Sequence, residues 1–274
     1  MSAPPPGAGP SSAEPPLGQD ELTRAARQLG VEAGMVLLVH ASLRSFGRWL
    51  IGGPVALLLA LEEAIGPEGT LVMPTHSADL SDPQPWQHPA VPESWWPRIR
   101  EELPAFRPDL TPTYGMGQLA ECFQRQEGTV RSDHPQVSFA ARGPMAEDIT
   151  RPHPLADGLG DNSPLARLYD LGGWVLLIGV DHSVNTSLHL AEYRAEFPGK
   201  RRLTQGAPVL VEGVRQWVTF PDVDIDSDDF GELGHAFEAS TDLVRQTEIG
   251  ASLWRLMPQR PLVDFAADWL LSHR

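Results

Sequence analysis

The chain has 274 residues and a formal net charge of −15, which disfavours nucleic acid as a ligand because phosphate binding needs clustered Lys and Arg side chains. A cationic partner is easier to accommodate. Hydrophobic residues make up 41% of the chain and suit a packed core, yet no apolar run approaches the ~20 residues of a membrane helix.

The segment 1–18 is rich in proline and lacks both the basic start and the apolar stretch of a signal peptide. We expect a disordered tail over 1–18 and one domain over 19–274, since no hydrophilic linker divides the remainder. Cys122 is the single cysteine of the sequence, which excludes an intramolecular disulfide and favours a reducing, cytoplasmic compartment.

The first part of this domain predicts a strand, crossover helix, strand unit. A helix is expected over 19–29, a buried strand over 36–39, a helix over 54–64 and a second strand over 69–74. Such a unit favours parallel strands, with ligands at their carboxyl ends. The stretch 75–112 is rich in Pro, Trp and Asp and has no clear period, and so long an insertion often covers or shapes a site.

The second part continues the alternation of helices and strands. Helices are expected over 117–126 and 164–169, strands over 138–141 and 174–180, and a hairpin over 209–220. An acidic block follows at 222–232, and 249–271 has the apolar spacing of a helix interrupted by a turn at 258–261. The pattern predicts a mixed α/β fold in which helices flank a central sheet.

The most informative segment follows the apolar strand 174–180. Thr186 is a candidate N-cap, which would place His189 at the third helical position. The positive end of the helix dipole disfavours the imidazolium form there, and a general base must be a neutral imidazole. Glu192 lies three residues further on, so it shares a helix face with His189 and can border the same pocket.

Three other interpretations of this segment stay open at this point. His189 and Glu192 could be ordinary surface residues of a capped helix. His182, His189 and Glu192 are also plausible metal ligands, but the spacing lacks the second histidine that helical zinc motifs place at i+4. A serine hydrolase is disfavoured because Gly-x-Ser-x-Gly is absent.

Six separate motifs then occur in an order that resembles the aminoglycoside 3-N-acetyltransferases, the antibiotic N-acetyltransferase family. They are Val36–Ser45, Gly69–Pro74, Arg131–Pro135, Gly160–Ala166, Asn185–Glu192 and Val263–Ala266. The resemblance covers the chain from Gln19 onward. It implies a single-domain mixed α/β fold distinct from the GNAT fold, and direct transfer of an acetyl group from acetyl-CoA without a metal.

The resemblance also implies roles for particular residues. His189 matches the catalytic histidine, Asp222 falls where relatives carry an acid thought to orient that histidine, and Glu192 matches an acid lining the substrate side. The residues that match loops near CoA are His40, Ser42, Leu43, Arg44, Thr75, Ser77, Arg131 and Ser138. The acids that could hold the ammonium groups of an aminoglycoside are Asp79, Asp82, Glu192 and Asp224.

Two departures bear on this carry-over. Many relatives have an acidic residue where this chain has Ser183, so the substrate pocket can differ in shape or charge. The acidic block is dense, so the alignment can slip from Asp222 to a neighbouring acid.

The sequence thus predicts an acetyl-CoA-dependent aminoglycoside acetyltransferase that confers antibiotic resistance, either a monomer or a homodimer, without nucleic acid or membrane partners. The alternatives are an acetyltransferase for another small amine, such as a biosynthetic intermediate, a catalytically silent binding protein of the same fold, and a metal-dependent hydrolase. An acidic acceptor face favours a polycation over the other amines.

Overall fold

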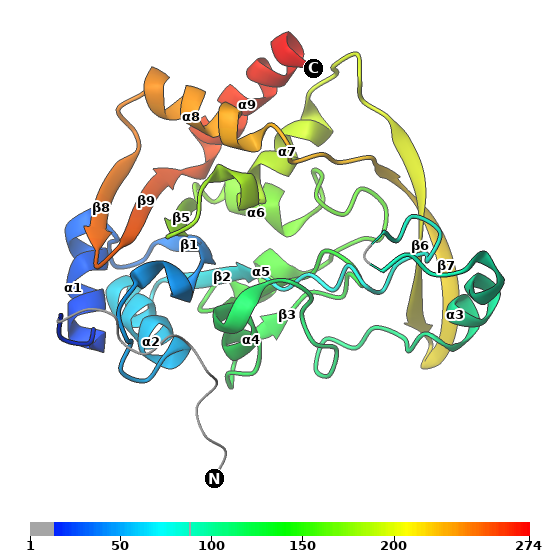
Figure 1. The fold of residues 1–274 in the computed structure, drawn as a ribbon, viewed down its shortest axis with the longest axis horizontal. Helices are drawn as coiled ribbons and strands as arrows, with labels where there is room; N and C mark the ends of the chain where they lie inside the picture. The colour runs from blue at the N-terminus through cyan, green and yellow to red at the C-terminus, as the bar shows by residue number, and fades with distance from the viewer. Residues whose placement is uncertain (1–13, 88) are drawn as a thin grey trace.

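A mixed sheet runs through the centre of the molecule, and a long hairpin stands apart from it (Figure 1). The computed structural model describes residues 14–87 and 89–274. The sheet strands are β1 Val36–Ala41, β2 Thr70–Pro74, β3 Val130–Arg131, β4 Phe139–Arg142, β5 Trp174–Ile178, β8 Arg245–Ile249 and β9 Ser252–Pro258. Within the described ranges these seven strands lie in the order β3-β4-β2-β1-β5-β9-β8.

The three central strands, β2, β1 and β5, run parallel, with Leu38 opposite both Val72 and Val175. The outer strands β4 and β9 are antiparallel to their neighbours. The helix α2 (Pro54–Ile65) connects β1 to β2, so the predicted strand, crossover helix, strand unit is confirmed. Because parallel strands end at the same edge, the loops after β1, β2 and β5 meet there.

The side chains of the central strands alternate between two hydrophobic cores. In β1, Leu37 and Val39 belong to one core and Leu38 to the other, as the period of two in a strand requires. The first core is closed by α1 (Gln19–Leu29), α2 and α4 (Gly117–Gln124). The second core is closed by α5 (Ala146–Thr150), α6 (Pro164–Asp170), α7 (Ser187–Arg194), α8 (Phe230–Ser240) and α9 (Gln259–His273). The expected mixed α/β fold with helices on both faces of a central sheet is confirmed.

The hairpin of β6 (Arg202–Val211) and β7 (Val214–Val223) is longer than the sequence predicted. The helix α3 (Trp96–Glu102), which together with η2 (Glu93–Trp95) belongs to the stretch 75–112, lies beside this hairpin in Figure 1. Arg215 of β7 donates to the carbonyl of Leu103 at 2.9 Å, and the N–H of Phe106 donates to the carbonyl of Pro208 at 3.0 Å. The irregular insertion is therefore anchored on the hairpin.

The prediction of helical structure over 249–271 is wrong in its first half. Residues 252–258 form β9, which pairs with β5 in the sheet, and the helix α9 begins only at Gln259. The spacing between Leu253 and Leu256 fits a helix. In the structure, however, burial alternates along a strand, and Trp254 and Leu256 are fully buried. Sheet pairing decides between the two periods, and it is not visible in the local sequence.

The end of the expected tail belongs to the packed structure. Residues 1–13 lie outside the described residues, whereas Leu17 has 1% of its surface exposed. The N–H of Leu17 donates to the carbonyl of Trp49 and its carbonyl accepts from the N–H of Ile51, both at 2.9 Å. Residues 14–18 thus continue the domain rather than the tail.

Candidate active site

The start of α7 presents His189 as the sequence predicted. The helix begins at Ser187, so His189 is its third residue. Asn185 holds this end of the helix, because its Oδ1 atom accepts the N–H of Ser187 at 3.2 Å. Thr186 occupies the N-cap position, but its hydroxyl lies 3.1 Å from Nε2 of His40 and makes no bond to the helix.

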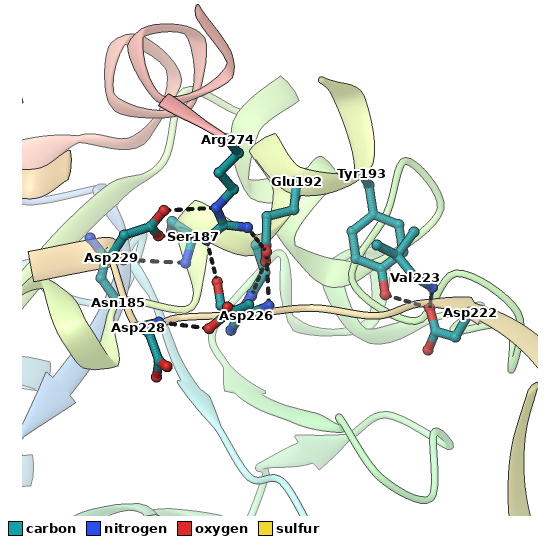
Figure 2. Close-up of polar contacts among 11 residues, drawn as sticks. Asn185, Ser187, Glu192, Tyr193, Asp222, Val223, Asp226, Asp228, Asp229 and Arg274 are labelled. Atoms are coloured by element: carbon teal, nitrogen blue, oxygen red, sulfur yellow. Dashed lines mark hydrogen bonds and ion pairs between the residues drawn. The ribbon is translucent and has the colours of Figure 1, made fainter. Parts of the chain in front are cut away.

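His189 is oriented by a buried carboxylate on its own helix. Its Nδ1 atom lies 2.5 Å from Oε2 of Glu192. The second oxygen of Glu192 accepts from Asp226 N–H at 2.9 Å and from Arg274 Nη1 at 2.5 Å (Figure 2). Glu192 is fully buried, and the Phe230 ring packs on the imidazole with centroids 4.8 Å apart. Because a carboxylate only accepts hydrogen bonds, the neutral imidazole carries its proton on Nδ1 and keeps the Nε2 lone pair for another proton.

The prediction that Asp222 orients His189 is wrong. The carboxylate of Asp222 accepts from the Tyr193 hydroxyl at 2.5 Å and from Val223 N–H at 2.8 Å, in a pair that lies to one side of Glu192 (Figure 2). Burial raises the pKa of Asp222 and also that of Tyr193. The expected place of Glu192 on the substrate side is also wrong, since its side chain has no exposed surface.

A groove of about 470 Å³ opens at the carboxyl ends of β1, β2 and β5. Its size falls within the range of pockets that hold small molecules and cofactors. One wall is the loop after β1, including η1 (Leu43–Phe46), and contributes the predicted residues His40, Ser42, Leu43 and Arg44. The opposite wall is the start of α4 at Gly117, and Thr186 lines the groove beside the helix of His189.

His40 joins this groove to α7. It has 7% of its surface exposed, and its Nε2 atom lies 3.1 Å from the Thr186 hydroxyl. Burial, with smaller contributions from the neighbouring His182 and His189, lowers the pKa of His40 to about 3. His40 is therefore a neutral hydrogen-bonding group at the pH of the cell, and it fixes the position of Thr186 over the groove.

The structure places four other predicted CoA residues away from the groove. Thr75, Ser77, Arg131 and Ser138 are all buried. Arg131 donates to Ser138 Oγ at 3.0 Å and to the Thr75 carbonyl at 2.6 Å, and Ser138 Oγ donates to the same carbonyl at 2.7 Å. Burial lowers the pKa of Arg131 to about 10. The four residues bind one another beneath the site, so the prediction that they contact CoA is not supported.

The predicted acceptor-side acids differ in what they already bind. Asp82 accepts two hydrogen bonds from Arg100, both at 2.8 Å, and these lower its pKa. Asp224 lies 3.4 Å from Arg201 in a largely exposed ion pair. Asp79 is exposed and makes no ion pair within the part of the chain that the structure describes. Of the three, Asp79 is the most available to a cation, and the role expected of Asp82 is not supported.

Sequence reasoning missed several residues that complete the site. Arg274 and Asp226 hold Glu192, and Phe230 holds the His189 ring. Asp226 lies 34 positions and Arg274 lies 82 positions beyond Glu192 in the sequence, so no local pattern marks them. Asn185 is the first residue of the motif Asn185–Glu192, and its residue type favours the start of a helix, so the sequence does carry a signal for its capping role.

Two further properties of the described residues concern metals and membranes. No group of three or more His, Cys, Asp or Glu side chains in 14–87 and 89–274 is arranged to hold a metal ion. No helix in these ranges is long and apolar enough to cross a membrane.

The geometry first defines a class of protein: a mixed α/β protein in which a histidine, held by a buried carboxylate, lies beside a groove at the carboxyl edge of the sheet. The family model of aminoglycoside 3-N-acetyltransferases matches residues 38–271. The chain therefore belongs to this family of acyltransferases, as the sequence motifs predicted.

Relatives match over nearly the whole chain. The Bacillus subtilis protein YokD, a prophage-derived aminoglycoside N(3')-acetyltransferase-like protein, is 42% identical over 94% of both chains. The aminoglycoside N(3)-acetyltransferase VII of Streptomyces paromomycinus is 35% identical over 93% of this chain and 92% of its own.

Solved structures agree with the fold. The YokD crystal structure superposes with a TM-score of 0.92 at 41% identity, covering 95% of both chains. The enzyme AAC-VIa bound to sisomicin gives 0.84 at 35% identity, covering 95% of this chain and 99% of the other. The complex of AAC-IIIb with CoASH gives 0.83 at 32% identity, covering 93% and 97%.

Proposed function

We propose that this chain transfers the acetyl group of acetyl-CoA to an amine of an aminoglycoside, with His189 as the general base. The observation that carries the proposal is the orientation of His189. Its Nδ1 atom is held by Glu192, and its Nε2 atom has no hydrogen-bond partner among residues 14–87 and 89–274. The side chain is 13% exposed, so Nε2 can meet a substrate without being fully hydrated.

The reaction follows from this tautomer. The amine enters the reaction as a neutral nitrogen, attacks the thioester carbon, and gives an N–H proton to Nε2 of His189 as the new C–N bond forms. The positive charge that develops on the ring is balanced by Glu192, in the way that a buried acid stabilises an imidazolium in other catalytic triads. The C–S bond then breaks and the thiolate of CoA takes the proton from His189. The products are the acetylated amine and CoA.

The groove is the place for acetyl-CoA. The exposed guanidinium of Arg44 can pair with a phosphate of the cosubstrate, and the first turn of α4, which no side chain caps, lines the same groove. Thr186 lines this groove and directly precedes α7, so we expect the thioester end of the cosubstrate to lie toward His189. The CoA complex of AAC-IIIb, a relative of the same fold, supports a CoA site in this chain.

The acceptor is an aminoglycoside. The chain carries a net charge of −15, and relatives of more than 30% identity are named for aminoglycoside N(3)-acetylation. Asp79 and Asp224 are our proposed contacts for its ammonium groups. Acetylation converts a basic amine into a neutral amide, which removes one of the charges by which such an antibiotic binds its target. We accordingly propose a role in resistance, in the cytoplasm, where acetyl-CoA is available.

The test is acetyl-CoA-dependent release of thiol with a panel of aminoglycosides that includes sisomicin. We expect turnover by the parent protein and a fall in kcat of roughly 10²–10⁴ in the His189→Ala variant. Mass spectrometry of the product identifies the added acetyl group. CoA binding without turnover of any aminoglycoside would contradict the proposed acceptor, and a parental rate in His189→Ala would contradict the proposed base.

A further inference from the structure

A second buried histidine, His182, lies behind the catalytic helix and takes no part in the chemistry above. It is in η3 (His182–Val184), the short helix between β5 and α7, and has 1% of its surface exposed. Gly234 of α8 packs directly on it, since a Cβ atom at that position would lie 2.0 Å from Cγ of His182. The ring is therefore enclosed and held in one place.

Both ring nitrogens of His182 have partners, and these define its tautomer. Nε2 lies 3.1 Å from Oε1 of Glu238, and Nδ1 lies 3.3 Å from Nδ2 of Asn185. A carboxylate only accepts and an amide NH₂ only donates, so the proton is on Nε2 and the lone pair of Nδ1 accepts from Asn185. Burial lowers the pKa of His182, which agrees with a neutral ring.

The amide of Asn185 passes this constraint to α7. While its NH₂ donates to His182, its Oδ1 accepts the N–H of Ser187, the first residue of α7, at 3.2 Å. The amide cannot be turned over without losing both bonds. The start of the helix, two residues before His189, is thus fixed by His182 through Asn185.

Glu238, the carboxylate partner of His182, is itself held by two strands of the main sheet. Glu238 lies 2.9 Å from Nε of Arg255 in β9 and accepts from Nε2 of Gln246 in β8, also at 2.9 Å. Both partners sit on strands paired in the main sheet. Glu238 cannot move toward His182 or away from it without breaking these contacts.

We propose that His182 is a positioning residue, which holds the first turn of α7 through Asn185 so that His189 meets the substrate amine in the right orientation. This inference rests on the role of His189 proposed above. A misplacement of a catalytic group by about 1 Å can cost on the order of 10² in rate, so the loss of such a support is measurable in kcat.

The test compares two substitutions at the same position. His182→Leu removes the acceptor that faces Asn185, whereas His182→Asn keeps an oxygen close to the place of Nδ1. With sisomicin and acetyl-CoA as substrates, we expect His182→Leu to lower kcat per folded molecule by at least about tenfold, and His182→Asn to recover most of it. Amide hydrogen exchange at Ser187 should be faster in His182→Leu and close to parental in His182→Asn.

A matched control is His153→Leu. His153 is also buried and also bonded through both nitrogens, but to Ser132 Oγ at 2.9 Å and the Gly158 carbonyl at 2.6 Å. We expect it to lower the melting temperature while kcat per folded molecule and the exchange at Ser187 stay parental. If His182→Leu behaves like His153→Leu, with kcat unchanged, the inference is overturned.

Asn185→Ala cuts the same link from the other side and serves where His182→Leu does not fold. It should lower kcat by a similar factor. The double variant should be as active as the less active of the two single variants, because both substitutions remove the same interaction. A parental kcat in Asn185→Ala also overturns the inference. His189→Ala, assayed in parallel, distinguishes the two proposals. If His189→Ala is inactive while His182→Leu is fully active, the role of His189 as the base stands and only the role of His182 is contradicted.

Discussion

His189 and Glu192 stand one turn apart on α7, with 2.5 Å between Nδ1 and Oε2. The carboxylate is fully buried, and Arg274 and Asp226 hold its other oxygen. Glu192 therefore cannot rotate toward solvent, and the imidazole it faces keeps the tautomer that leaves Nε2 unprotonated. The hydrogen-bonding groups that decide this tautomer come from three separate parts of the chain.

The first prediction concerns Glu192→Gln. The amide of glutamine can turn its NH₂ toward Nδ1, which favours the tautomer with the proton on Nε2, and it carries no charge to balance an imidazolium. We expect kcat to fall by ~10²–10⁴, by analogy with the same change in other catalytic triads, while KM for acetyl-CoA stays nearly constant. Steady-state kinetics at neutral pH measures both constants.

Asp222→Asn is the matched control for this prediction. It removes a buried carboxylate of the same region, but one that accepts from Tyr193 rather than from His189. We expect kcat to change by less than about tenfold. A larger loss in Asp222→Asn than in Glu192→Gln would return the orienting role to Asp222.

The contrast between Glu192 and Asp222 shows what the sequence could predict. His189 and Glu192 are three residues apart, so helix geometry alone brings them to one face. Asp222 lies near the end of β7, 29 positions from its partner Tyr193, and the local sequence does not show which residue of α7 its carboxylate meets. The resemblance to the family does not show which of the two residues, His189 or Tyr193, this acid contacts.

Long-range contacts limited the rest of the prediction in the same way. The strands of the parallel centre and the loop of His40 follow from local patterns, and the structure has them where they were expected. Thr75 and Ser77 also follow a central strand, and the resemblance to the family implied that they contact CoA. Arg131, distant in sequence, instead covers the Thr75 carbonyl and the Ser77 hydroxyl from within the protein.

The second prediction concerns Arg274, whose guanidinium binds both Glu192 and Asp229. These contacts raise its pKa, Asp229 having the largest effect. Arg274→Ala leaves the buried carboxylate of Glu192 without its cation, and breaking a buried pair in this way costs about 3–5 kcal/mol. We expect a marked fall in melting temperature and in kcat. Arg274→Lys, which keeps the charge but not the fork of donors, should lie between the alanine variant and the parent.

The third prediction concerns the groove. Arg44 is exposed at its wall and makes no ion pair among the described residues, so its charge is available to a phosphate. We expect Arg44→Ala to raise KM for acetyl-CoA by roughly 3–30-fold with little change in kcat, because water weakens a charge-assisted hydrogen bond at this exposed side chain. Arg98→Ala, at an exposed arginine of α3 that pairs with Glu102, is the control and should leave both constants parental. Equal effects of the two variants would mean that Arg44 acts only through net charge.

The fourth prediction concerns Ser138, which the sequence assigned to CoA and the structure assigns to a buried network. Its hydroxyl donates to the Thr75 carbonyl and accepts from Arg131. We expect Ser138→Ala to lower the free energy of unfolding by about 1–3 kcal/mol, because a buried donor group of Arg131 loses its partner. KM for acetyl-CoA should stay within a factor of about two of the parent. A variant of parental stability with a raised KM would restore the role of Ser138 as a CoA ligand.

The fifth prediction concerns pH and His40. Its pKa is about 3 in the folded protein, chiefly because of burial, against 6.5 for an unperturbed histidine. Between these values the unfolded chain binds a proton that the folded chain does not, so stability falls as the pH is lowered through 6.5 toward 3. Between pH 7 and pH 5 this single group removes about 2 kcal/mol of unfolding free energy.

His40→Asn isolates this contribution, because asparagine does not titrate. Urea unfolding at pH 7 and at pH 5 gives the free energy of unfolding lost on acidification, for the parent and for the variant. Comparing these two losses removes the direct cost of the substitution, which is the same at both pH values. We expect the variant to lose about 2 kcal/mol less than the parent. Equal losses would mean that His40 takes up a proton in the folded protein at pH 5. At that pH the ring beside the Thr186 hydroxyl would then be an imidazolium, and the link between the groove and α7 would not rest on a neutral His40.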